Sequence, residues 1–218
     1  MSENLFEAQY DVTLKSKLKK FYEKNKILLF SIIFIFLISI VGISFYAQSK
    51  EEKKILLTES YIKAKVYLSN ENKDKAKNIL KTIIFADDST YSTLSLFLLL
   101  NENLIENQKE LINLFDHVLE NNKFEKEVRN LIIFKKALFQ SDFVSESELL
   151  KSLNLLINTE TVWKAHALLL LGDYFAYKKE YSKAKEFYIQ ILSLKNLNKE
   201  FYVQAKSQLT IIVNEQKN

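Results

Sequence analysis

One uninterrupted apolar segment, residues 27–46, lies near the start of the chain. It reads ILLFSIIFIFLISIVGISFY and contains no charged, amide, proline or histidine side chain. A helix rises about 1.5 Å per residue, so this segment would be about 30 Å long, which matches the hydrocarbon core of a bilayer. The pattern therefore predicts a transmembrane helix from Ile27 to Tyr46.

Beyond this segment the pattern changes, and from about residue 55 apolar positions recur every three or four residues. The series Tyr61, Ala64, Tyr67 and Leu68, for example, places its side chains on one face of a helix. Short polar clusters interrupt the periodicity at residues 69–72, 87–89, 106–108, 121–122 and 141–146. The chain has no proline and two glycines, and so it lacks the residues that tight turns between strands usually require. The pattern predicts an all-α domain of consecutive amphipathic helices.

A helical-hairpin repeat is clearest in residues 165–198, which follow the tetratricopeptide pattern of about 34 residues. The tetratricopeptide pattern has, in order, a large residue, a leucine, a glycine, an aromatic residue, an alanine and a second aromatic residue. The residues of this chain at those positions fit the pattern: Leu168, Leu171, Gly172, Phe175, Ala184 and Tyr188. Gly172 and Ala184 are small where the two helices of the hairpin would cross, so their backbones can approach closely. Ile191 and Asn196 depart from the pattern, which has a small residue and a proline there.

Weaker repeats in the same phase begin near residues 57, 92 and 130. Residues 200–213 form one more amphipathic helix, which is suited to cap the exposed end of a stack. We therefore predict one N-terminal transmembrane helix followed by a tetratricopeptide-like solenoid of about four hairpins and a C-terminal capping helix.

The residues that flank the apolar segment predict its orientation. Six lysines lie in residues 1–26, whereas three lysines and two glutamates follow in residues 50–54. The positive-inside rule then places the N-terminus in the cytoplasm and the hairpins outside it. The apolar core is longer than that of a signal peptide, and its exit begins with the aromatic residues Phe45 and Tyr46, which favours an uncleaved anchor. The predicted segments are a cytoplasmic tail (1–26), the transmembrane helix (27–46), a linker or helix extension (47–56) and an extracytoplasmic domain (57–218).

Composition and motifs argue against several functional classes. The net charge is +4, of which residues 1–26 supply +2, so the exported part is nearly neutral and nucleic-acid binding is not expected. No cysteine is present for disulfides or thiolate chemistry. His117 and His166 lack the spacing of metal ligands, and Asp116 with Glu120 is interpreted as a solvated helix face. The sequence also has no glycine-rich phosphate-binding loop. We therefore expect that the protein is not an enzyme and that it binds no cofactor and no metal.

The whole layout resembles the YfgM-like proteins of bacterial inner membranes. The resemblance rests on the lysine-bearing tail, on residues 21–26 before the single span, on residues 47–61 leading into the first repeat, and on the small degenerate repeat domain. It implies an ancillary subunit of the SecYEG-type translocon that associates with a membrane-anchored chaperone of the PpiD type and assists exported client proteins. It also implies a single-pass protein of the inner membrane whose C-terminal domain is periplasmic. A scaffold for another envelope assembly, such as cell division or cell-wall synthesis, is the alternative.

In a tetratricopeptide stack, the first helix of each hairpin lines the concave surface, which predicts a partner-binding groove. The residues expected to face this groove are Tyr61, Lys65, Phe97, Leu100, Phe134, Leu138, Leu169 and Asp173. Its apolar middle would suit an amphipathic helix or an unfolded segment. Alternatively, the same residues pack against neighbouring helices of a short stack. Trp163 is likewise either a binding aromatic or, as we favour, a packing residue between repeats.

Overall fold

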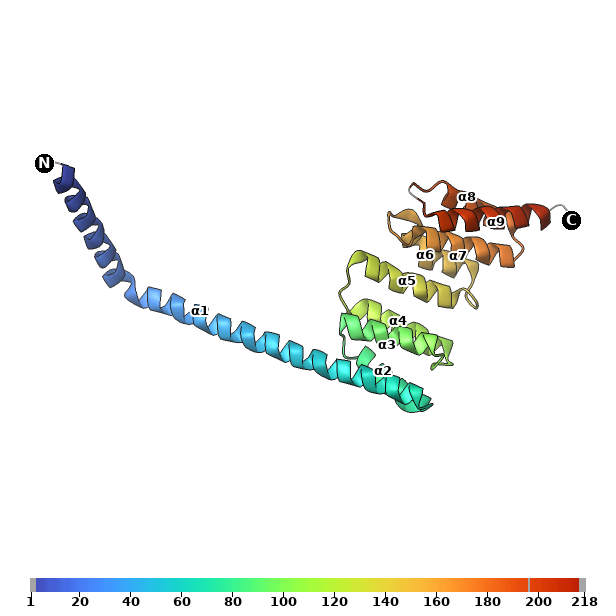
Figure 1. Ribbon diagram of the computed structural model, residues 1–218, viewed down its shortest axis with the longest axis horizontal. Coiled ribbons are helices and arrows are strands. Elements are labelled where there is room, and N and C mark those ends of the chain that lie inside the picture. The colour runs from blue at the N-terminus through green and yellow to red at the C-terminus, as the bar shows by residue number, and fades with distance from the viewer. Residues whose placement is uncertain (1–2, 196, 216–218) are drawn as a thin grey trace. The chain divides into compact units, whose positions relative to one another are not determined.

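The computed structural model describes residues 3–195 and 197–215, with side chains from residue 19 onward. The secondary structure of this described part consists of α-helices, shown in Figure 1. In chain order they are α1 (Glu3–Ser69), α2 (Lys73–Ile84), α3 (Ser89–Asn101), α4 (Gln108–Asn121), α5 (Lys126–Gln140), α6 (Glu146–Asn158), α7 (Lys164–Tyr177), α8 (Tyr181–Leu192) and α9 (Lys199–Glu215). The predicted all-α class, with a long apolar N-terminal helix followed by packed helix pairs, is confirmed.

The chain divides into two units, Met1–Leu57 and Thr58–Asn218. In the first unit the apolar side chains of the predicted span are exposed, apart from half-buried Leu29. Ser31 and Ser39 donate hydrogen bonds to the backbone carbonyls of Ile27 (2.9 Å) and Ile35 (2.8 Å), so their hydroxyls are satisfied within the helix. A hydroxyl without such a partner would be costly in lipid. In the described part of the chain, α1 alone is long and apolar enough to cross a membrane, as an anchor or a signal sequence would.

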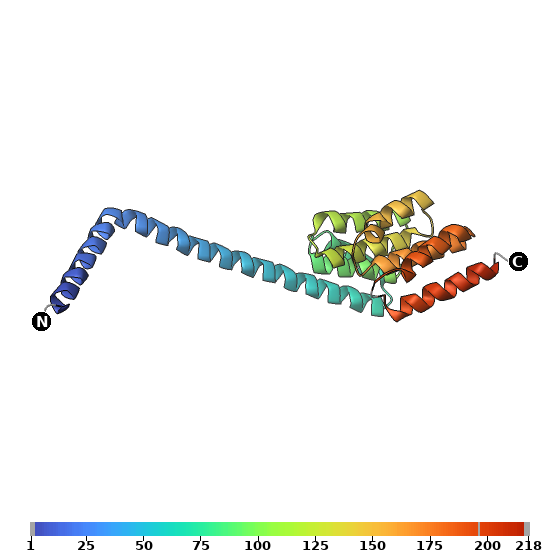
Figure 2. The ribbon, with the colours of Figure 1, turned by 90° about the horizontal axis from the view of Figure 1, so that it is seen from above.

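The second unit is a stack of helical hairpins that follow one another in chain order (Figures 1 and 2). The last turns of α1 pair with α2, and the next pairs are α3 with α4, α5 with α6, and α7 with α8. The final helix, α9, packs on both α8 and α7. This order matches the predicted four hairpins and terminal helix.

Polar residues at the predicted breaks begin several of these helices. The Asp88 side chain accepts hydrogen bonds from two backbone N–H groups in the first turn of α3, and Asn107 does the same once for α4. Ser145 and Glu148 form a reciprocal capping box at the start of α6. These hydrogen bonds lower the pKa of Glu148 below the usual value for a glutamate. A side-chain cap of this kind contributes about 1 kcal/mol.

In the fourth hairpin α7 and α8 pack together, and an aromatic ring of α8 fills the space beside Gly172. A Cβ atom added to Gly172 would lie 2.5 Å from Cε1 of Tyr188, so the ring of Tyr188 occupies the space that a side chain would need. Ala184 is fully buried in the same hairpin. The Tyr188 hydroxyl donates to Oδ1 of Asp173 at 2.6 Å, which fixes the far end of the ring.

Two hydrophobic cores stabilise the stack. The first lies mainly in the first two hairpins and is centred on Leu80, Leu96 and Phe115, with Ile132 added from α5. The second joins the last two hairpins to α9 and includes fully buried Tyr188. Burying a large apolar side chain contributes about 1.5–3 kcal/mol, so these cores dominate the stability of the domain.

Ion pairs connect successive hairpins at the surface. Lys81 of α2 pairs with Glu110 of α4 at 2.5 Å, Lys136 of α5 pairs with Asp116 of α4, and Lys183 of α8 pairs with Glu146 of α6 at 2.8 Å. Each junction between hairpins therefore has a lysine–carboxylate contact. Pairs this exposed contribute little energy, so they specify how neighbouring hairpins align more than they stabilise them.

Candidate protein-binding surface

We call the outward side of the first helix in each hairpin the A-helix face, and it belongs to α1 from Thr58 onward, α3, α5 and α7. The residues predicted to line it differ in exposure: Lys65 and Leu138 are exposed, whereas Tyr61, Phe97, Leu100, Phe134, Leu169 and Asp173 are half-buried. Half-burial means that each of these side chains has one side packed in the domain and another side accessible.

In the first two hairpins, the predicted residues flank the first core. Tyr61, Phe97 and Leu100 pack against its buried leucines. The ring of Tyr61 lies 6.2 Å from that of Tyr91, and burial raises the pKa of Tyr61. The hydroxyls of Thr58 and Tyr91 are 2.5 Å apart, which joins α1 to α3. These contacts are the self-packing that the sequence left open as an alternative.

In the last two hairpins, Phe134 and Leu169 flank the second core. Phe134 stacks on Trp163 with ring centroids 5.7 Å apart, and the indole Nε1 donates to the carbonyl of Glu127 at 2.9 Å. Trp163 is therefore a packing residue at the joint between the third and fourth hairpins. The predicted row is thus divided into two groups, one beside each core.

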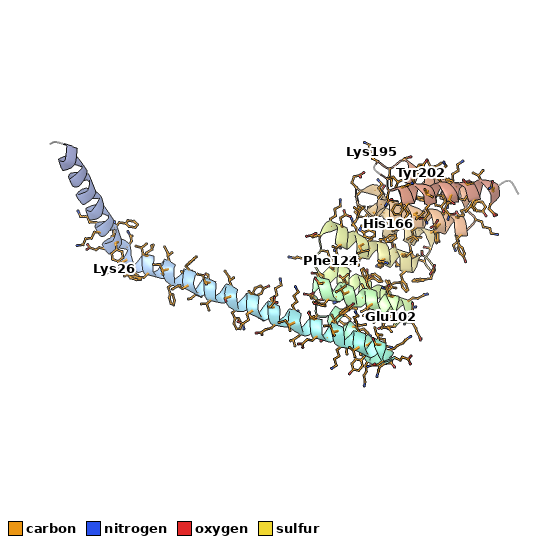
Figure 3. The ribbon with its side chains drawn as sticks, in the orientation of Figure 1. Lys26, Glu102, Phe124, His166, Lys195 and Tyr202 are labelled. Carbon is orange, nitrogen blue, oxygen red and sulfur yellow. The ribbon has the colours of Figure 1, made fainter. Side chains whose placement is uncertain are left out.

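His166, labelled in Figure 3, belongs to the same aromatic joint. Its ring lies 4.9 Å from Trp163 and 4.6 Å from Phe201 of α9. Burial lowers the pKa of His166, which favours the neutral imidazole. His117 lies elsewhere, on α4, where its Nε2 is 2.8 Å from Asp87. Among the described residues, no group of three or more acidic or histidine side chains is placed to hold a metal ion.

A pocket of about 370 Å³ opens on the A-helix face between the C-terminal ends of α5 and α7. Asp173 contributes to its lining, as do Asp142, Leu170, Tyr174 and Tyr177. The sequence predicted Asp173 as a binding-surface residue, but it did not predict the other four. Asp142 belongs to a polar break between helices, and only the packing of α5 beside α7 brings it to the same pocket.

Asp173 lies in an unusual environment for a carboxylate. Burial raises its pKa, and the hydrogen bond from Tyr188 opposes that effect only in part. The pKa of the Tyr188 phenol is raised far above its ordinary value, first by burial and then by its bond to Asp173. The neutral phenol is therefore a permanent donor, and the carboxylate is held in place with incomplete solvation.

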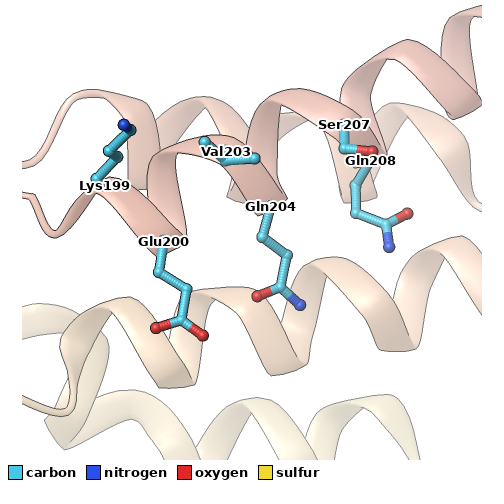
Figure 4. Close-up of a pocket in the computed structure, with 6 residues that line it drawn as sticks. All are labelled: Lys199, Glu200, Val203, Gln204, Ser207 and Gln208. Carbon is cyan, nitrogen blue, oxygen red and sulfur yellow. The ribbon is translucent and has the colours of Figure 1, made fainter.

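A second hollow, shown in Figure 4, lies along one face of α9. Glu200, Gln204 and Gln208 point to the same side of the helix in this view. α9 buries Ala205 and Ile212 in the second core, whereas its Tyr202, Val203 and Ile211 are exposed. Because α9 packs on both helices of the last hairpin, it is placed to cap this end of the stack.

No protein-family model, no curated protein and no solved structure matches this chain. The finding leaves an all-helical protein with a long apolar N-terminal helix and helical hairpins, without an identified family.

Proposed function

We propose that this protein is a membrane-anchored helical-repeat module that binds other proteins and carries out no chemistry of its own. The observation that carries the proposal is the presence of large exposed side chains on the A-helix face, above all Leu138 at 41 % and Tyr177 at 84 % exposure. Large exposed side chains that gather beside a pocket are typical of surfaces that contact protein partners.

The proposed location follows from the first unit. The exposed apolar helix anchors the chain in a bacterial inner membrane, with the N-terminus in the cytoplasm and the hairpins in the periplasm. The excess of lysines before the span supports this orientation.

The proposed partners are those that the resemblance to YfgM-like proteins implies. The module would associate with a SecYEG-type translocon and a PpiD-type chaperone, and its A-helix face would contact one of them or an exported client. The half-buried residues of this face would complete their burial on binding, which contributes to affinity without unfolding the stack.

The test is a crosslinking and purification experiment from native membranes. The tagged full-length chain is crosslinked in cells, solubilised in detergent and purified, and its partners are identified by mass spectrometry. An unrelated single-span protein with the same tag supplies the background. Enrichment of translocon subunits is expected. Enrichment of division or wall-synthesis proteins would instead identify another envelope assembly, and no enrichment above background would contradict the proposal.

A further inference from the structure

The lining of the pocket between α5 and α7 contains both apolar and acidic residues. Leu170 and Tyr174 supply apolar surface, and Asp142 and Asp173 contribute their carboxylates. Leu138, the exposed leucine of the A-helix face, lies one turn before Ser141, whose hydroxyl donates to the carbonyl of Leu138 at 2.7 Å and which also lines the pocket. The exposed leucine therefore lies one helical turn from residues that line the pocket.

The ends of two helices add to the negative charge of this pocket. It lies at the C-terminal ends of α5 and α7, where the aligned peptide dipoles give a helix a partial negative charge. Neither helix has a basic residue in its last turn, and Lys178 directly follows the end of α7. Of the described residues that line the pocket, Lys178 is the basic one, and its Nζ lies 5.6 Å from the centroid of the Tyr174 ring. Two carboxylates and two helix ends thus oppose a single lysine.

An aromatic ring stands at the rim of the same pocket. Tyr177 lines the pocket at the end of α7 and is 84 % exposed, so its ring is accessible from solvent. An accessible ring beside carboxylates can contact a cation through its face while the carboxylates supply hydrogen-bond acceptors. A phosphate or another anionic group would meet repulsion here.

We infer that the pocket receives a lysine or arginine side chain from a protein segment whose apolar residues contact Leu138. The inference rests on the proposed function, because it names the chemistry of the partner on the same face. Asp173 is the anchor of the pocket, because the Tyr188 hydroxyl holds its carboxylate at 2.6 Å. Burial has removed part of the water from that carboxylate, and an arriving cation compensates for this loss.

Peptide display against the full-length protein in nanodiscs tests the inference. A random peptide library is selected for binding, and the affinities of the selected peptides are measured on three variants. The first is Asp142→Asn with Asp173→Asn, in which the amide oxygen introduced at position 173 can still accept the Tyr188 hydrogen bond. The second is Leu138→Asp, which disrupts the apolar part of the surface. The matched control is Glu102→Gln, an exposed carboxylate at the C-terminal end of α3 (Figure 3).

The selected peptides should be enriched in lysine or arginine next to apolar residues. The double asparagine variant should weaken their binding by at least about tenfold, because a charge-assisted hydrogen bond is lost. The control should change it by less than about twofold. Melting curves of Asp142→Asn alone and of the double variant verify folding, and the single variant carries the test if the double one is unstable.

Two results would overturn the account in different ways. If binding is lost in Leu138→Asp but unchanged in the asparagine variants, or if the selected peptides lack basic residues, the inference is wrong and the proposed binding face survives. If no peptide is selected, or if Leu138→Asp leaves binding unchanged, the proposed face itself is wrong.

Discussion

Replacing Gly172 by alanine tests the closest contact in the fold. The added Cβ would lie 2.5 Å from Cε1 of Tyr188 and 2.9 Å from Cδ1 and Cζ. Carbon atoms in good contact are about 3.5–4.0 Å apart, so the ring would have to move by about 1 Å. Tyr188 cannot do so freely, because the ring is fully buried and its hydroxyl is bound to Asp173.

Two opposing effects determine how much Gly172→Ala changes the free energy of unfolding. Overpacking of a core usually costs about 1–3 kcal/mol. Alanine is favoured over glycine inside a helix by about 1 kcal/mol, which offsets part of that cost. Because a 2.5 Å contact lies far inside the normal contact distance, we take the upper part of the overpacking range, about 2–3 kcal/mol. The expected net loss is then about 1–2 kcal/mol, which would lower the Tm of a domain of this size by about 2–8 °C.

The assay is thermal unfolding of the full-length protein in detergent, followed by the fluorescence of Trp163, the single tryptophan. Trp163 packs against the N-terminal part of α7 and therefore reports on the fourth hairpin. The chain offers a matched control, because Gly42→Ala adds a Cβ with no atom within 4 Å and should leave the transition unchanged. In a Tyr188→Leu background, Gly172→Ala should become neutral or stabilising, because the clashing ring is absent.

A higher Tm for Gly172→Ala alone would refute the reasoning. It would mean that helix propensity outweighs the contact, and that the ring of Tyr188 does not occupy the crossing. An equal loss of stability in the Tyr188→Leu background would refute it as well, since the cost would then have another source.

Three further predictions follow from the same structure. Phe134→Ala should lower the free energy of unfolding by about 1–3 kcal/mol in a urea titration, because it removes the stack on Trp163; an unchanged midpoint would instead identify Phe134 as a free surface residue. Because the pKa of Asp173 is raised, this carboxyl binds a proton more readily in the folded state than in the unfolded state. Its contribution to the free energy of unfolding therefore falls as the pH rises from the ordinary carboxyl range through the raised pKa. In Asp173→Asn, the plot of Tm against pH should lack this fall, and the same pH dependence in the variant and the unchanged protein would contradict the raised pKa of Asp173. A reporter that is active only outside the cytoplasm, fused after residue 218, should be active, whereas activity of a cytoplasm-only reporter at the same site would reverse the proposed orientation.

Local patterns in the sequence predicted much of the fold. The apolar run of residues 27–46 lies within α1, and the polar breaks contain the capping side chains of Asp88, Asn107 and Ser145. Close packing at Gly172 within one hairpin was also predictable, but the sequence paired this glycine with Ala184, whereas the ring of Tyr188 fills the space beside it.

The surface was harder to predict because it depends on contacts between hairpins. Phe134 and Leu138 are both apolar and one turn apart, yet one stacks on a tryptophan of the next hairpin and the other is exposed. Periodicity identifies the face of a helix but not which neighbour covers it. The pocket with Asp142 and Asp173 likewise exists because α5 and α7 pack side by side.

The central claim, that the A-helix face binds protein partners, is tested most directly by site-specific photo-crosslinking in living cells. Benzoylphenylalanine replaces Leu138 in one protein and Leu155 in another, and the two leucines are similarly exposed at 41 % and 48 %. Leu155 lies on α6, the second helix of its hairpin, and so serves as the control. We predict discrete protein adducts from position 138 and none from position 155. Equal adducts from both positions, or adducts from position 155 alone, would contradict the claim.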